Sequence, residues 1–380
     1  MSKVVARSFM LTTLVVSMLG VSFNAIPASS AVSPYPGGSC RKAGRAATYR
    51  QFELRCVRQR GSLTWRTVNS LATPIITLDN LDAFWTPIVA RRSVMAALAR
   101  NPVVASSAAY SVAPGVVTSQ IAEEQRLLAK SERLFGNHFR PARYDVVLFS
   151  QHDGAWADAK MSELGAGLPY AVSQEIQRGM SGNTCNFGFA TKGKNGHFFG
   201  QCMDTAGRVL RDKQTPIHEY FHLVQMHHMA AEPMPCWLME GSATFFGAAL
   251  GIDEDDESGD TSLIFLRELM SQYNPDGDKP RGSRSDLIAA LASNENPLRV
   301  FKDLSAKPDG TQNCLPLASY AVGSLMTEAL VASYGFAAFM EFITSFATKS
   351  SWQEDFRRVF GIEPESFFEK VRPYVLSKSQ

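Results

Sequence analysis

The chain has 380 residues, of which 45% are hydrophobic and 19% are charged. This composition is that of an ordinary globular protein and excludes a disordered or a fibrous chain. The length allows two or three compact units with a full hydrophobic core, and the formal net charge is only +2.

Residues 1–31 have the three parts of a secretory signal peptide. Lys3 and Arg7 form a positively charged start, residues 10–26 are mostly apolar, and residues 27–31 supply small side chains for signal peptidase. Polar residues interrupt the apolar run, which makes it a poor membrane anchor; an uncleaved anchor is the alternative. No later stretch reaches the length needed to span a bilayer. We therefore predict a secreted protein, extracellular or cell-wall associated, with no stable membrane span and no nucleic-acid partner.

Residues 32–70 are predicted to form a small basic module stapled by cysteines. It holds eight basic residues and one acid, Glu53, for a local charge of +7. Such a patch suits an anionic surface, for example a cell-wall polymer or phospholipid headgroups. The alternative is a solvated face of a small domain. The basic residues are Arg41, Lys42, Arg45, Arg50, Arg55, Arg58, Arg60 and Arg66.

Six cysteines in an exported chain predict three disulfides. Residues 183–190 and 197–204 flank a turn-rich loop and predict a β-hairpin. Folding this hairpin about Gly193 and Lys194 sets Cys185 opposite Cys202, and a bridge there would stabilise the hairpin by about 3 kcal/mol through loop-closure entropy. The other two pairs follow only by elimination: Cys40 with Cys56, and Cys236 with Cys314.

The middle of the chain alternates helix and strand patterns. Apolar spacing predicts a helix around residues 78–100, and residues 106–115 are interpreted as a linker. Residues 119–135 predict a second helix with one apolar side, ended by Gly136. The Val-rich run 144–149 predicts a strand.

The segment 215–222 carries residues suited to metal chemistry. Thr215 and Pro216 predict the start of a helix, because Thr caps a first turn and Pro tolerates it. His218 and His222 are four residues apart and therefore lie on one stripe of that helix, where two imidazoles can bind one metal ion. Glu219 is rotated away from the ligands but stays close, which suits a base that activates a metal-bound water.

A second helix is predicted to supply the third ligand. Pro235 lies near its first turn and Gly251 near its end, and Glu240 stands 18 positions after His222. Small residues after Glu240 make this helix narrow, so it can approach the first helix closely. Two histidines and one carboxylate leave a tetrahedral position open, which is typical of a catalytic zinc site.

The sequences His-Glu-Tyr-Phe-His at 218–222 and Trp-Leu-Met-Glu-Gly at 237–241 resemble the gluzincin clan of metallopeptidases. The resemblance implies Zn²⁺ bound by the two histidines and Glu240, with Glu219 as the general base for peptide hydrolysis. It also implies an α+β fold: a thermolysin-like catalytic domain with a small sheet, an active-site helix pair and a helical C-terminal subdomain.

The same resemblance implies two further roles, and the sequence departs from the family pattern at position 244, among other places. Strand 197–204 would be the edge strand along which substrate lies. Tyr320, in the Tyr-x-x-Gly pattern 320–323, would stabilise the oxyanion; a core tyrosine with a satisfied hydroxyl is the alternative. Thr244 stands where thermolysin-like enzymes have an aspartate that supports a metal ligand.

These features predict a secreted zinc metallopeptidase that acts on peptide or protein substrates. The alternative is a surface-binding protein in which residues 32–70 do the work and the peptidase-like body is catalytically silent. The acidic run 253–260 is interpreted as a solvated loop, with calcium binding as its alternative. The expected organisation is a signal peptide (1–31), a basic module (32–70), a helix and linker (71–115), a catalytic part (116–250), loops (251–282) and a helical subdomain (283–380).

Overall fold

The computed structural model describes residues 34–251 and 283–380, apart from short breaks. The predicted signal peptide (1–31), Cys185 and the predicted loop 253–260 therefore lie outside the described residues. The breaks are at residues 36, 50–51, 60–61, 70–73, 84, 167, 169–170, 180–186, 204–208, 230–232, 306–313, 315–317 and 349.

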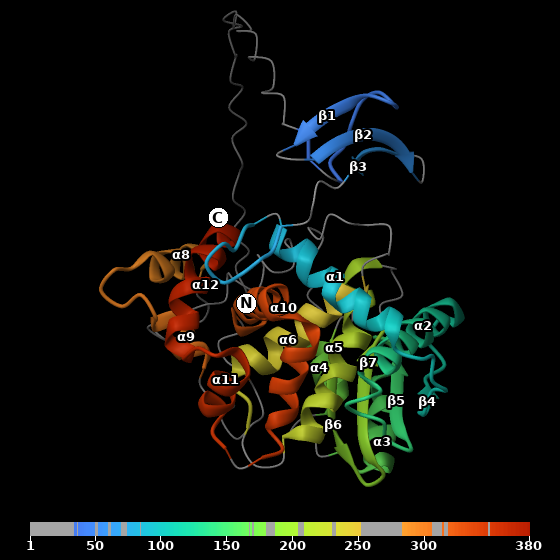
Figure 1. The fold of residues 1–380 in the computed structure, drawn as a ribbon. Coiled ribbons are helices and arrows are strands. Elements are labelled where there is room, and N and C mark those ends of the chain that lie inside the picture. The colour runs from blue at the N-terminus through green and yellow to red at the C-terminus, as the bar shows by residue number, and fades with distance from the viewer. Residues whose placement is uncertain are drawn as a thin grey trace, which may run out of the picture.

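The fold is α+β, with two small sheets and many helices (Figure 1). The first sheet is antiparallel in the order β1-β2-β3. Cys40 and Cys56 form a disulfide with a Cα–Cα distance of 5.9 Å, which confirms the pairing expected by elimination. Leu54 and Trp65 are buried, so this sheet has one apolar face. Its strands are β1 (Ala46–Tyr49), β2 (Phe52–Gln59) and β3 (Ser62–Asn69).

The second sheet has the order β4-β5-β7-β6, in which β6 alone is antiparallel to its neighbour. The predicted strand at 144–149 is confirmed: every residue of β5 is buried, as expected for a Val-rich strand covered on both faces. The predicted linker 106–115 is wrong in part, because it contains β4. All five residues of β4 are half-buried, so the strand lacks the alternation that marks a strand in sequence. The strands are β4 (Ala108–Val112), β5 (Tyr144–Phe149), β6 (Gly188–Gly193) and β7 (Gly196–Cys202).

The predicted hairpin is present as β6 and β7, but its register is shifted by two residues. Gly193 pairs with Gly196, so the turn is centred on Lys194 and Asn195 rather than on Gly193 and Lys194. Gly196 has a φ of 107°, which favours glycine at the end of this turn. In consequence Cys202 lies opposite Phe187, whose carbonyl oxygen accepts from the Cys202 N–H at 2.9 Å. Cys202 is disulfide-bonded, and its predicted partner falls in a break of the described chain.

Four helices lie among these strands. The first begins at Trp85 rather than near residue 78, since the Asp82 carboxylate accepts from the Trp85 N–H at 3.0 Å and caps the helix there. The second confirms the helix predicted at 119–135. The helices are α1 (Trp85–Arg100), α2 (Thr118–Phe135), α3 (Gly154–Leu164) and α4 (Val172–Gly179).

The predicted pair of motif helices is present as α5 (Val209–His228) and α6 (Cys236–Gly251), and the two pack against each other. The predicted start of the first helix is wrong: α5 begins at Val209, so Pro216 lies inside it. Proline has no N–H to donate to the carbonyl one turn back, but its fixed φ is compatible with a helix that continues through it.

Every described element after residue 283 is a helix, as the sequence predicts. They are α8 (Arg284–Ala292), α9 (Arg299–Leu304), α10 (Ala318–Ser345), α11 (Trp352–Phe360) and α12 (Pro364–Ser379).

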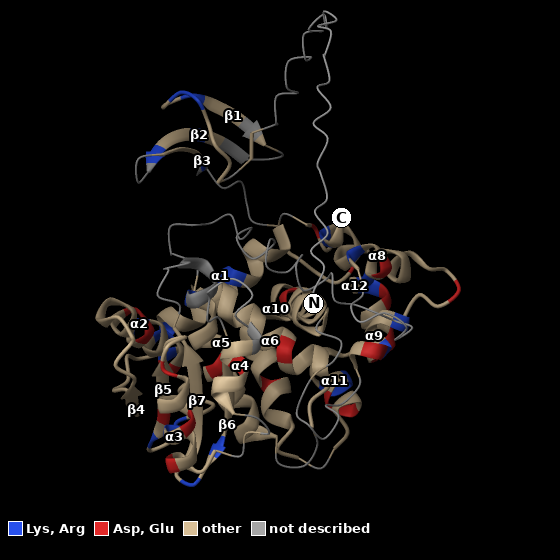
Figure 2. Ribbon diagram, turned by 180° about the vertical axis from the view of Figure 1, so that it is seen from behind, with Lys and Arg blue, Asp and Glu red and all other residues tan. Residues whose placement is uncertain are grey.

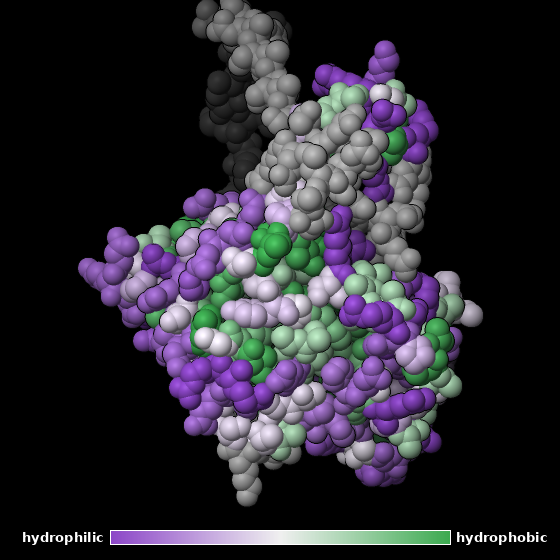
Figure 3. All heavy atoms as spheres, in the orientation of Figure 1, coloured by the Kyte–Doolittle hydropathy of each residue, from purple (hydrophilic) through white to green (hydrophobic). Residues whose placement is uncertain are grey.

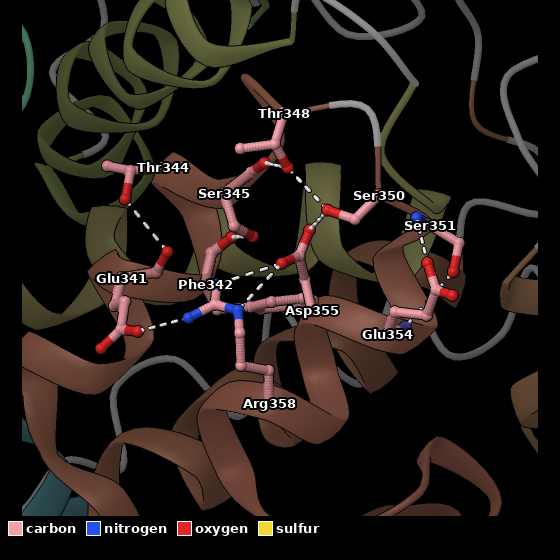
Figure 4. A network of polar contacts seen from close by, with 10 residues as sticks. All are labelled: Glu341, Phe342, Thr344, Ser345, Thr348, Ser350, Ser351, Glu354, Asp355 and Arg358. Atoms are coloured by element: carbon pink, nitrogen blue, oxygen red, sulfur yellow. Dashed lines mark hydrogen bonds and ion pairs between the residues drawn. The ribbon is translucent and has the colours of Figure 1, made fainter.

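A polar network fixes the junction between α10 and α11 (Figure 4). Ser351 and Glu354 form a capping box at the start of α11. Arg358 then bridges the two helices, donating to Glu341 at 2.7 Å and to Asp355 at 3.0 Å. These contacts orient the C-terminal helices that pack beside α10.

The helix α10 is 28 residues long, with a mean hydropathy of 1.3 over its most apolar window. The expectation that no later stretch reaches spanning length is therefore wrong for α10. However, Gly335, with a φ of 86°, breaks it into two shorter helices, and α10 packs against α1 and α6. Because 67% of that window is buried inside the protein, we describe α10 as a core helix. Figure 3 shows mostly polar side chains on the face seen in Figure 1, with hydrophobic ones gathered near its middle.

Candidate metal centre

The helices α5 and α6 bring His218, His222 and Glu240 together. The two histidine Nε2 atoms are 2.9 Å apart. The Glu240 Oε2 atom lies 3.4 Å from the His218 Nε2 and 3.3 Å from the His222 Nε2. All three ligand atoms lie within 4.8 Å of one another, so this group can hold a metal ion.

The chemistry of these atoms fits a divalent cation. Glu240 Oε2 is buried and has no donor in hydrogen-bonding geometry, although two ring nitrogens face it. Burying a carboxylate oxygen without a hydrogen-bond donor costs free energy of folding unless a cation binds that oxygen. Imidazole and carboxylate ligands suit zinc and similar transition metals, and three of them leave a coordination position open.

Without a metal ion, the charge of the Glu240 carboxylate is balanced by a proton on a histidine. Burial lowers the pKa of His222, but the neighbouring Glu240, Glu219 and Gln225 outweigh burial and raise that pKa to about 9. Burial raises the pKa of Glu240, but His222 and His218 outweigh it and hold that pKa below its ordinary value. Burial, followed by the charge of His222, lowers the pKa of His218. The metal-free site at neutral pH is thus a protonated His222 beside an ionised Glu240.

Glu219 lies next to this group and is only 4% exposed. Burial raises the pKa of its carboxyl to about 8. Its side chain lies against Gly188 of β6: a Cβ atom at position 188 would be 2.6 Å from Glu219 Oε1. Glycine at 188 therefore gives the carboxyl the space that any larger residue would fill.

This contact identifies the strand that borders the site and corrects the predicted edge strand. Residues 197–204 were expected at the edge, but β7 lies between β5 and β6. The edge strand beside Glu219 is β6, because the antiparallel partner of the hairpin adds to the outer side of β7.

The helix α10 places Tyr320 beside the three candidate ligands. The rings of Tyr320 and His218 are stacked, with centroids 5.8 Å apart and planes 3° from parallel. This approach depends on Gly241 of α6 and Gly323 of α10, whose backbones touch: a Cβ atom at 323 would lie 2.9 Å from the Gly241 Cα. The oxyanion role of Tyr320 stays a prediction.

A disulfide between Cys236 and Cys314 joins the start of α6 to the segment before α10. Its Cα–Cα distance is 5.2 Å, and it confirms the second pairing expected by elimination. The bridge and the glycine contact together fix how the two helices lie.

Sequence reasoning missed Gln225, which lies one helical turn after His222. Its Oε1 atom is 2.7 Å from the His222 Nδ1. The (i, i+3) spacing on one helix was the available signal. Thr244 does not support a ligand side chain, since its hydroxyl donates to the backbone carbonyl of Glu240 at 2.8 Å.

No protein-family model and no curated protein matches this chain. Its function must therefore be argued from the site itself.

Proposed function

We propose that this protein is a secreted zinc metallopeptidase of the gluzincin type. The observation that carries the proposal is the convergence of His218, His222 and Glu240 from two packed helices, with a buried carboxyl, Glu219, beside them. A structural metal site has no need of a second buried carboxyl group beside its ligands or of an open ligand position, whereas hydrolysis needs both a base and room for water.

Each group at the site has its own role in the proposed reaction. Bound zinc would polarise the scissile carbonyl and make water a better nucleophile at neutral pH. Glu219 accepts a proton from the attacking water and passes it to the leaving amine, for which a carboxyl pKa raised by burial is suited. Tyr320 donates a hydrogen bond from its phenol to the developing oxyanion.

The strand β6 supplies a surface for the substrate in this proposal. It ends the order of the second sheet, so among the described strands none pairs with the outer side of its backbone. An extended peptide could add there by backbone hydrogen bonds. Gly188 would then bring the peptide backbone close to Glu219.

Disulfide bonding supports the proposed export. Two bridges are described, Cys202 is also disulfide-bonded, and none of the described cysteines is free. Such bonds persist in oxidising compartments outside the cytosol.

The proposal is tested by metal analysis combined with cleavage of a peptide library. We expect about one zinc ion per chain, as set by one three-ligand site. Cleavage should disappear on treatment with a zinc chelator and return on addition of zinc. His218→Ala should lose both metal and activity, whereas His152→Ala, outside the site, should keep both. Unchanged cleavage after complete metal removal, or stoichiometric zinc with no cleavage of any peptide, would sink the proposal.

We also propose that residues 32–70 bind an anionic polymer and hold the enzyme near a cell surface. The observation that favours this is the register of β2 and β3, which sets Arg55 directly opposite Arg66 on one face of the sheet. Two like charges side by side concentrate positive charge on this face, which attracts an anion. Arg55 and four other basic residues of this module are exposed, and Figure 2 shows Lys and Arg on this sheet. The exposed ones are Arg41, Lys42, Arg45, Arg55 and Arg58.

The test is retention of the full chain on immobilised polyphosphate as salt is raised. Wild type should elute at higher salt than Arg55→Glu, because each lost phosphate contact lowers the salt dependence of binding. Peptide turnover should be the same in both proteins. Equal elution of both would contradict the polymer-binding role, and retention without any peptide turnover would favour the silent-body alternative.

A further inference from the structure

We propose that Gln225 is a positioning residue that fixes the orientation and tautomer of His222, so that its Nε2 atom carries the lone pair for the metal. The inference rests on the metal site of the proposed function. Gln225 belongs to α5 and is 1% exposed. Its side-chain amide contacts His222 on the same helix and the backbone of α6. A buried amide with both ends bonded has little freedom to reorient.

The nitrogen end of the amide is held by acceptors. Gln225 Nε2 donates to the Met239 carbonyl at 2.9 Å and to the Leu238 carbonyl at 3.3 Å. It also donates to Ser242 Oγ at 3.0 Å. The Ser242 hydroxyl gives its own proton to the Leu238 carbonyl, so its oxygen is an acceptor toward Gln225. Three acceptors therefore decide which end of the amide is nitrogen.

The oxygen end must then face His222. Gln225 Oε1 is 2.7 Å from His222 Nδ1, and an amide oxygen can only accept. Nδ1 therefore carries the hydrogen. In a neutral imidazole with Nδ1–H, the other nitrogen has the free lone pair. That nitrogen, Nε2, is the atom that faces His218 and Glu240.

The same amide also aligns the second ligand helix. Its acceptors lie from Leu238 to Ser242, and therefore flank Glu240 on α6. One side chain thus ties the ring of a ligand on α5 to the backbone that carries the ligand on α6. Supporting partners of this kind are commonly worth 10- to 100-fold in metal affinity.

The partner is neutral, which sets it apart from a supporting carboxylate. Position 244 is a threonine, whose hydroxyl donates to the backbone carbonyl of Glu240, so this position supplies no carboxylate to a ligand ring. An amide orients His222 without adding a negative charge. The site with a dication bound therefore keeps a more positive charge than a carboxylate partner would leave.

The test compares wild type with Gln225→Leu and Gln225→Glu, using competition with a chromophoric zinc chelator. We expect Gln225→Leu to weaken zinc binding by roughly 10- to 100-fold. Gln225→Glu keeps an acceptor for Nδ1–H but loses the N–H groups that bond the Met239 and Leu238 carbonyls, so it should recover only part of that loss. Circular dichroism of the metal-free proteins checks that each variant is folded. A folded Gln225→Leu protein with wild-type zinc affinity would overturn the inference.

A measurement on wild type alone covers the case in which the variants do not fold. Nitrogen-15 NMR of histidine-labelled, zinc-loaded protein shows which ring nitrogen of His222 binds the metal. We expect a protonated Nδ1 and a zinc-bound Nε2; coordination through Nδ1 would overturn the inference. If wild type binds no zinc at all, the proposed function fails, and that result differs from a zinc-binding protein that is indifferent to Gln225.

Discussion

Replacing Glu219 with glutamine is expected to lower the rate of peptide hydrolysis by about 10²- to 10⁴-fold, the range attributed to a positioned acid–base group. Glutamine keeps the shape of the buried side chain but cannot carry a proton between water and amine. Glu219 is not among the three converging ligands, so the zinc content should stay that of wild type. The measurement is kcat/KM on a cleaved peptide beside metal analysis. The control is Glu365→Gln, at an exposed position on α12, and turnover of Glu219→Gln at the wild-type rate would rule out this base.

The same variant should change how many protons leave when zinc binds. In the metal-free protein the pKa of His222 is about 9 and that of Glu219 about 8, so both hold protons at pH 7. A dication excludes the proton on the His222 ring and favours the Glu219 carboxylate. Zinc affinity should therefore rise with pH up to about 9, the raised pKa of His222. Calorimetry in two buffers of different ionisation enthalpy should find fewer protons released by Glu219→Gln, and equal numbers would contradict this account.

Replacing Gly323 with alanine is expected to destabilise the protein by about 1–3 kcal/mol and to weaken zinc binding. The added methyl group would lie 2.9 Å from the Gly241 Cα and closer still to the Trp237 carbonyl. These are backbone atoms, which cannot rotate away as a flexible side chain can. The helices α6 and α10 must separate, and this moves Glu240 and Tyr320 relative to His218.

Urea unfolding of the metal-free protein and a zinc titration measure the two effects. Ala337→Leu is the control, because it adds more atoms to α10 at an exposed position beyond the break at Gly335 and leucine is nearly as good a helix former as alanine. The control should change neither quantity by much. If Gly323→Ala has the stability and zinc affinity of wild type, the close contact of the two glycines does not position the site.

The elements that the sequence predicted well are those with a strong local pattern. The strand β5 is a run of Val and neighbouring apolar residues, and the helix α6 is bounded by Pro235 and Gly251. The ligands His218, His222 and Glu240 follow from helical spacing plus a second motif, and the structure brings them together. Their chemistry as a peptidase site stays a prediction.

The features that were missed depend on partners far away in sequence. Strand β4 consists of half-buried residues that become a strand only by pairing with β5. The hairpin register is decided between two glycines, at 193 and 196, and either allows a tight turn. Gln225 belongs to no motif, and its role becomes visible only when α6 supplies the acceptors for its amide.

The touching backbones of Gly241 and Gly323 also limit how this protein can evolve. Each residue occupies the volume in which the side chain of the other would stand, so neither can drift to a larger amino acid alone. A larger residue at either position would force α6 and α10 apart. That separation would also move Glu240 and Tyr320, which these two helices carry. Orthologues should therefore keep both glycines or replace both together, even where the surrounding apolar residues differ.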